Sequence, residues 1–202
     1  MRLNFGFLLI IALALPIAQA ATVSVQLYDG AGRQLPGGGV VFLESREAKL
    51  MAKPVASAEI AQVNKQFVPR VLVVPVGTSV SFPNRDTVRH HVYSFSPNKT
   101  FELKLYTGTS ASPVVFDKAG TAVLGCNIHD SMAAWVVVVE TPHYGLTGAD
   151  GRLTLGQIPA GAYRLRTWHP GLPPGAPAQD QALLVPAAGA VPASVKLVGL
   201  AL

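Results

Sequence analysis

Residues 126–132, with the sequence CNIHDSM, carry three side chains that can bind a metal ion: the thiol of Cys126, the imidazole of His129 and the thioether of Met132. A second imidazole, that of His90, stands 36 residues before Cys126. Thiolate and thioether sulfur are soft donors that favour Cu(I), and imidazole suits both oxidation states of copper. Two imidazoles and a thiolate in a plane, with a distant axial methionine, describe a mononuclear copper site for electron transfer.

Cys126 is the only cysteine of the 202 residues. Exported proteins usually use cysteines in disulfide pairs. A single thiol therefore has one of three roles: it is buried and inert, it binds a metal, or it acts as a nucleophile. An isolated cysteine or methionine is more often part of a hydrophobic core. The ligand spacing of His129 and Met132 after Cys126 favours the metal ligand here.

Two other uses of these residues stay open. A zinc site would take Cys126, His129 and both His90 and His91, but adjacent residues of a strand point to opposite faces of a sheet. A catalytic Cys–His dyad would need an orienting third group and a substrate cleft, and the sequence identifies neither. His143 and His169 stand in turn-like contexts beside proline, which predicts surface or structural roles.

The first twenty residues have the pattern of a cleavable signal peptide. Arg2 supplies the positive start, residues 5–15 the apolar stretch, and Ala18-Gln19-Ala20 a small-residue cleavage signal. We therefore expect a mature chain that begins near Ala21, is exported to the periplasm and has no transmembrane segment after cleavage. The formal net charge is +5 and the basic residues are scattered, so the composition gives no support for nucleic-acid binding.

The mature sequence predicts an all-β fold. Short apolar or alternating stretches are separated by Gly, Pro, Asn and Asp, as in a β-sandwich or barrel. Residues 45–66 are weakly patterned and predict a short helix and a loop. The expected strands cover residues 39–43, 68–74, 79–82, 92–95, 101–106, 114–116, 121–125, 133–140, 181–185 and 194–198.

The two flanks of the chain share a second pattern of strand, glycine-rich turn and strand, at residues 23–43 and 147–167. They resemble the two halves of the carboxypeptidase regulatory-like (prealbumin-like) β-sandwich, and neither half has enough strands to be stable alone. We expect residues 21–60 and 141–202 to form one discontinuous domain, with residues 61–140 inserted as a second. One continuous, enlarged sandwich is the simpler alternative.

Residues 67–140 resemble the cupredoxins, which have a Greek-key β-sandwich. The C-x-x-H-x-x-M spacing of residues 126–132 is similar to that of the amicyanins, and VSFPNRDTVRHHV is similar to the segment that carries the first histidine ligand. The resemblance to these plastocyanin- and amicyanin-like proteins, some of them labelled methylamine-utilisation proteins, implies one copper ion. It also implies His90 and His129 as imidazole ligands, Cys126 as the thiolate and Met132 as the axial ligand, with His129 nearest the surface.

The sequence departs from the cupredoxin pattern in two ways. His91 stands where cupredoxins generally have an asparagine that pins the ligand loop, and Ile128 and Asp130 flank His129 where a proline is common. Groups around the ligands tune metal affinity and reduction potential, so neither property can be carried over from the family.

The function predicted from these residues is a periplasmic one-electron carrier, not an enzyme, that works with an unidentified redox partner protein. Two alternatives remain: a module that binds or delivers copper without redox chemistry, and an envelope binding protein built on the β-sandwich. Nothing in the sequence indicates an amine substrate.

Overall fold

The computed structural model describes residues 20–109 and 112–201. The predicted all-β fold is confirmed, since these residues form seventeen strands and one short helix, α1 (Arg46–Met51). The predicted signal peptide lies outside the described residues, except for its last residue. In the part of the chain that is described, no helix is long and apolar enough to cross a membrane.

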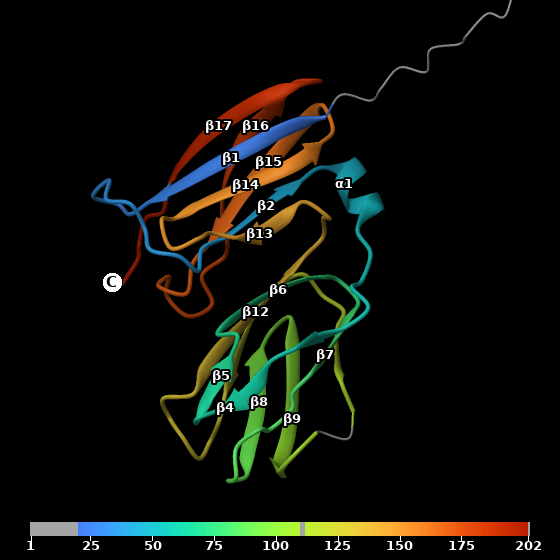
Figure 1. Cartoon of the computed structure of the whole chain (residues 1–202), viewed down its shortest axis with the longest axis vertical. Helices are drawn as coiled ribbons and strands as arrows, with labels where there is room; N and C mark the ends of the chain where they lie inside the picture. Colours follow the sequence, from blue (N-terminus) through green and yellow to red (C-terminus); the bar gives the residue numbers. More distant parts are fainter. Residues whose placement is uncertain (1–19, 110–111, 202) are drawn as a thin grey trace, which may run out of the picture.

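The first two strands of the chain lie among the last five, in what we call the terminal body (Figure 1). One of its sheets has the order β14-β1-β17, and the other the order β13-β2-β15-β16. Buried side chains from both sheets, among them Val25, Leu43 and Leu165, form one core between them. The strands are β1 (Ala21–Tyr28), β2 (Val40–Glu44), β13 (Tyr144–Leu146), β14 (Arg152–Ile158), β15 (Gly161–Trp168), β16 (Gln179–Val185) and β17 (Gly189–Lys196).

The middle of the chain forms the central body, whose main sheet has the order β6-β12-β11-β8-β9. Two smaller sheets, β10-β7-β3 and β4-β5, complete it, and Phe82, Val92 and Phe116 lie in its core. The strands are β3 (Ala58–Glu59), β4 (Ala61–Val63), β5 (Gln66–Val68), β6 (Val71–Pro75), β7 (Thr78–Ser81), β8 (His90–Ser96), β9 (Lys99–Tyr106), β10 (Val114–Phe116), β11 (Gly120–Gly125) and β12 (Ala133–Val139).

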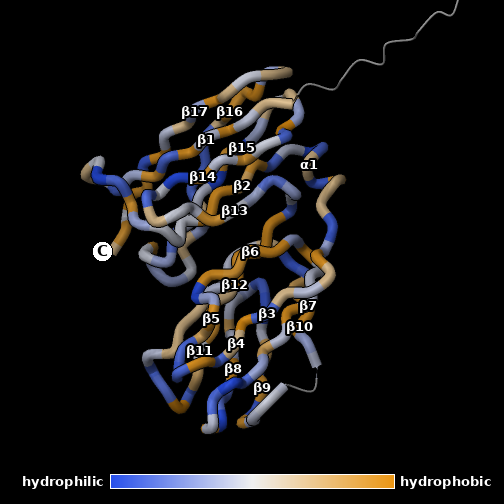
Figure 2. The backbone as a smooth tube through the Cα atoms, in the orientation of Figure 1, coloured by the Kyte–Doolittle hydropathy of each residue, from blue (hydrophilic) through white to orange (hydrophobic). Residues whose placement is uncertain are grey.

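Strand β12 links the two bodies, because its two faces are both buried. Val136 and Val138 belong to the core of the central body, whereas Val137 and Val139 belong to a separate hydrophobic cluster with Trp168 of the terminal body. A strand buried on both faces has a continuous apolar sequence, as the run of valines in β12 does. Figure 2 shows hydrophobic residues along β6 and β12 where the bodies meet.

The expected strands were found, most of them with shifts of at most two residues, although β17 begins five residues before the expected start at residue 194. Three further local features differ. The expected strand over residues 68–74 is divided into β5 and β6 by Pro69 and Arg70. Strand β8 begins at His90, two residues earlier than expected. Within residues 45–66 the expected short helix is present, with Ser45 as its N-cap, but two short strands follow where a loop was expected.

The strand pairings of the described residues fall into two groups, β1, β2 and β13–β17 in one and β3–β12 in the other. We propose that the two groups are separate domains, with the expected division into residues 21–60 and 141–202 and residues 61–140, except that β3 (Ala58–Glu59) pairs with β7 and so lies with the central group.

Candidate metal centre

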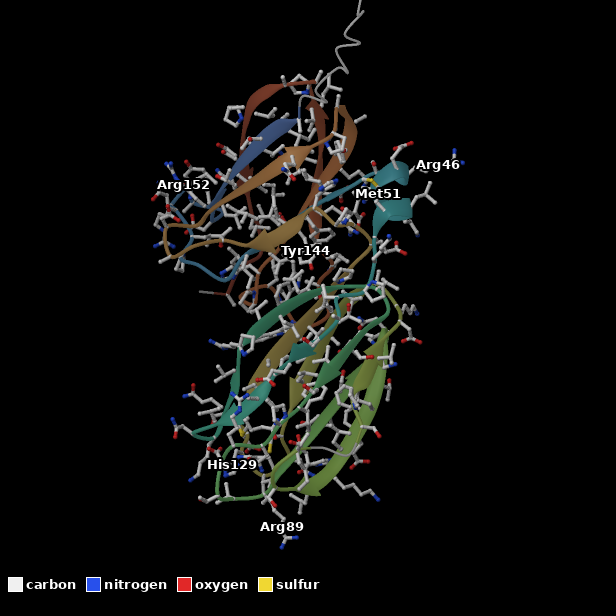
Figure 3. The ribbon with its side chains drawn as sticks, turned by 45° about the vertical axis from the view of Figure 1, so that its right-hand side comes forward. Arg46, Met51, Arg89, His129, Tyr144 and Arg152 are labelled. Atoms are coloured by element: carbon white, nitrogen blue, oxygen red, sulfur yellow. The ribbon has the colours of Figure 1, made fainter. Side chains whose placement is uncertain are left out.

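Two neighbouring strands of the main sheet bring the candidate ligands to one end of the central body. Strands β11 and β8 pair at Gly125 and Tyr93, so the residue after β11, Cys126, lies beside the start of β8. His90 is the first residue of β8. His129 lies in the short loop from Cys126 to β12, and Figure 3 shows it at the end of the central body that faces away from the terminal body.

Three donor atoms meet at this end. The Nδ1 atom of His90 lies 3.9 Å from Sγ of Cys126. One ring nitrogen of His90, the sulfur of Cys126 and one ring nitrogen of His129 all lie within 4.8 Å of one another. The two imidazole rings are 5.1 Å apart and inclined by 58°. Atoms at these separations can bind one ion between them after small movements of the side chains.

The surroundings of the donors fit a metal ion. His90 is fully buried and Cys126 is 3% exposed, whereas His129 is partly exposed. The Nδ1 atom of His129 is buried and has no hydrogen-bond partner among the described residues. A buried polar atom without a partner is costly, so each such atom needs an explanation. An ion held between His129, Cys126 and His90 would provide one.

Met132 lies in the same loop, where its backbone N–H donates a hydrogen bond of 2.9 Å to the carbonyl oxygen of His129. Its side chain is 2% exposed and belongs to the same core cluster as Cys126. The structure thus keeps the thioether out of solvent and close in sequence to two of the donors. We propose it as the axial ligand.

The donor set fits a single copper ion. Two imidazole nitrogens, one thiolate and one thioether are the ligand types of a type 1 copper site, and the soft sulfur donors favour copper over hard cations. His90, Cys126 and His129 would hold the ion, and Met132 would complete its environment.

His91, the residue after the first candidate ligand, turns away from the three donors. Its Nε2 atom lies 2.9 Å from a carboxylate oxygen of Glu102 on β9, without the alignment of a hydrogen bond. Its ring lies 5.7 Å from that of Tyr93, which points to the same side of the sheet. This placement agrees with the expectation that adjacent histidines face opposite sides, and it leaves a zinc site built from both histidines without geometric support.

The second ring nitrogen of His90, Nε2, lies 2.8 Å from the carboxylate of Asp86. Asp86 was not predicted from the sequence as a partner of His90. Its position four residues before His90 was the only indication of this contact. The path of the loop between the two residues cannot be predicted from the sequence alone. Partial burial acts to raise the pKa of Asp86, but hydrogen bonds from Lys65, His90 and Asn64 outweigh it and hold that pKa below its usual value.

Asn84 fixes the loop that runs from Asn84 to His90. Its side-chain amide donates to the carbonyl oxygens of Val88 and Tyr106, and its own carbonyl oxygen accepts from the backbone N–H of Asp86. Burial, against a lowering by a hydrogen bond with Gln62 and with a smaller contribution from the nearby Cys126, raises the pKa of Tyr106 to about 12. The Tyr106 hydroxyl therefore stays protonated and donates to the carbonyl oxygen of Phe82.

The remaining two histidines lie in the terminal body and have no part in this cluster. His169 is 5% exposed, and its Nδ1 atom accepts a hydrogen bond from the backbone of Gly171. The ring of His143 packs edge-on against Tyr163. Burial lowers the pKa of both imidazoles. Both contacts are structural, in line with the sequence-based expectation.

A pocket of about 500 Å³ lies beside the candidate site. The residues that line it include Cys126, Met132 and Phe95, which is 74% exposed. Pro174 and Gly175, from the proline-rich loop of the terminal body, also line it. The terminal body thus contributes to the surroundings of the site.

Solved structures similar to this chain include several copper proteins. The copper-containing nitrite reductase of Thermus scotoductus SA-01 is 26% identical, with a TM-score of 0.39, over 45% of this chain and 26% of that one. A reduced Cu(I) amicyanin variant is 21% identical, with a TM-score of 0.38, over 49% of this chain and 98% of that one. A purple cupredoxin from Nitrosopumilus maritimus is 26% identical, with a TM-score of 0.34, over 41% of this chain and 99% of that one.

Each of these three is a copper protein or a cupredoxin. The similarity to the nitrite reductase spans about a quarter of that enzyme's length. No protein-family model matches the chain, and no curated protein matches it. The TM-scores of these three structures lie below 0.5, and the assignment of a copper site rests on the donor atoms described above.

Proposed function

We propose that this protein is a periplasmic one-electron carrier, and not an enzyme, that holds one copper ion between His90, Cys126, His129 and Met132. The observation that carries the proposal is the meeting of the His90 and His129 nitrogens and the Cys126 sulfur within 4.8 Å, together with the unpartnered Nδ1 of His129. Bound copper would supply a Cu(I)/Cu(II) couple that gains and loses one electron.

The chain itself supplies a rigid setting for this couple. His90 and Cys126 are held by the paired strands β8 and β11, and both are buried. Ligands fixed by a sheet change little in position when the charge of the ion changes. His129 is partly exposed at the tip of the central body, so its ring edge is the natural contact for a redox partner protein.

The absorption spectrum of the Cu(II)-loaded protein tests the proposal. We expect intense thiolate-to-copper absorption in the visible range for the wild type and its loss in Cys126→Ser, because serine provides no thiolate. His169→Asn is a matched control, since that histidine lies in the terminal body and should leave the spectrum unchanged. Colourless wild-type protein after copper loading would contradict the proposal.

One observation favours a second function, the binding or delivery of copper without electron transfer. The pocket beside Cys126 and Met132 is lined in part by Pro174 and Gly175 of the terminal body, which offers a place where a protein that exchanges copper can reach the sulfur ligands. Voltammetry separates the two functions. A reversible one-electron couple supports the carrier, and a site that binds copper with no such couple supports delivery.

A further inference from the structure

A carboxylate stands behind the first candidate ligand, on the side away from the other donors. Asp86 Oδ2 lies 2.8 Å from His90 Nε2, while the other ring nitrogen, Nδ1, faces Cys126 at 3.9 Å. The imidazole is 0% exposed and the aspartate side chain is 12% exposed. Both nitrogens of this ring therefore have defined neighbours, and water has little access to either.

The carboxylate is held by the backbone of a separate hairpin. Asn64 and Lys65 form the two-residue turn between β4 and β5, and both have positive φ angles, of 51° and 57°. Their N–H groups donate to Asp86 Oδ1 and Oδ2 at 2.6 and 2.8 Å. Asparagine tolerates this left-handed conformation, but lysine adopts it uncommonly. The two hydrogen bonds to Asp86 help to hold the turn in this form.

The side chains around Asp86 leave its charge directed at His90. Arg85, the preceding residue, forms an ion pair with Glu59 instead. The backbone N–H of Asp86 is itself fixed by the side chain of Asn84. The hairpin, Asn84 and Asp86 together form a chain of hydrogen bonds that ends on the imidazole.

We infer that Asp86 is a positioning residue that orients the His90 ring, keeps its proton on Nε2 and leaves the Nδ1 lone pair for the copper ion. The inference rests on the proposed function. A carboxylate that accepts from the second nitrogen of a ligand histidine fixes its tautomer and raises its basicity as a ligand. The negative charge also stabilises Cu(II) more than Cu(I), because the attraction grows with the charge of the ion.

The metal-free wild-type protein provides the first test. Nitrogen-15 correlation spectra of the histidine rings, recorded at a pH high enough for the ring to carry a single hydrogen, should show that hydrogen of His90 on Nε2. A hydrogen on Nδ1 would overturn the inference. This measurement needs neither copper nor a variant, so it holds even if substitution of Asp86 prevents folding.

The second test compares two substitutions that each remove one carboxylate charge from a neighbouring histidine. Asp86→Asn acts on His90, and Glu102→Gln acts on His91, which has no donor role. We expect Asp86→Asn to bind Cu(II) ten- to a hundredfold more weakly and to have a raised reduction potential. Each tenfold loss of Cu(II) affinity relative to Cu(I) affinity corresponds to about 59 mV for a one-electron couple.

Glu102→Gln should keep the Cu(II) affinity and potential of the wild type. Equal values for Asp86→Asn and the wild type, or equal shifts in both variants, would overturn the role of Asp86. A different result would contradict the proposed function: a wild-type protein that shows no thiolate-to-copper absorption. A coloured Asp86→Asn protein with the wild-type potential would contradict the positioning role alone.

Discussion

His90 and His129 use their ring nitrogens in different ways. His90 is fully buried, with Asp86 behind one nitrogen and Cys126 in front of the other. His129 is partly exposed, and its Nδ1 is buried without a partner. One imidazole is thus held in position by the protein, and the other joins the buried site to the surface. This difference suits a site that must both retain an ion and exchange electrons with a partner.

Met132 is the proposed axial ligand, so we expect its substitution to change the reduction potential with little effect on copper binding. We expect Met132→Leu to keep the visible absorption, because the thiolate and both imidazoles remain, and to raise the reduction potential. Leucine removes a sulfur donor and leaves a more apolar environment that disfavours the higher charge of Cu(II). Voltammetry of the copper-loaded variant measures the shift. A potential equal to that of the wild type would show that the thioether does not contact the ion.

Residue types and spacing were enough to nominate the four candidate ligands, because Cys126, His129 and Met132 lie in one loop. Alternation across a strand predicted that only one of His90 and His91 can enter the site, and the resemblance to the cupredoxins favoured His90. Asp86 and Glu102 were not predicted as partners of these histidines. Their placement depends on the path of the loop after Asn84 and on the register of β8 against β9, where a β-bulge shifts the pairing next to His90.

At the scale of elements, the strand that ends at Cys126 is packed closely against its neighbour. A Cβ atom on Gly125 would lie 2.6 Å from Cζ and 2.7 Å from the hydroxyl oxygen of Tyr93. The absence of a side chain at Gly125 thus lets the tyrosine ring cover the strand next to the thiol. The sequence marked this glycine only as the end of a strand, because close approach between two strands cannot be read from either one.

We expect Gly125→Ala to destabilise the protein by about 1–3 kcal/mol, the usual cost of inserting a methyl group into a packed site. Gly156→Ala on β14 is the control, since a Cβ there meets nothing within 4 Å. Urea unfolding of the metal-free proteins measures both free energies of unfolding. If the two variants lose equal stability, the contact with Tyr93 has no energetic role.

The terminal body supplies none of the candidate ligands, yet it contacts the rest of the molecule in two places. It shares a hydrophobic cluster with the central body, and its residues Pro174 and Gly175 line the pocket beside Cys126. The glycine-rich turns were enough to predict that the two ends of the chain share a pattern of strand, turn and strand. The contact between the bodies was not predicted, because it depends on side chains such as Trp168 that read only as parts of strands.

Trp168 is the largest buried side chain of this contact. It is 3% exposed, its ring lies 6.1 Å from that of Trp135 on β12, and its cluster includes Val137 and Val139 of that strand. We expect Trp168→Ala to lower the free energy of unfolding by about 3–5 kcal/mol, as removal of a buried aromatic ring does. Urea unfolding of the metal-free protein, followed by far-ultraviolet circular dichroism, measures the loss.

Leu184→Ala on β16 is the matched control, since that side chain is 77% exposed and should change the stability by less than about 0.5 kcal/mol. The shape of the transition carries further information. Because the cluster joins β12 to the terminal body, its loss should separate one cooperative transition into two. A Trp168→Ala protein that unfolds in a single step with the stability of the Leu184→Ala control would show that the two bodies do not stabilise each other through this contact.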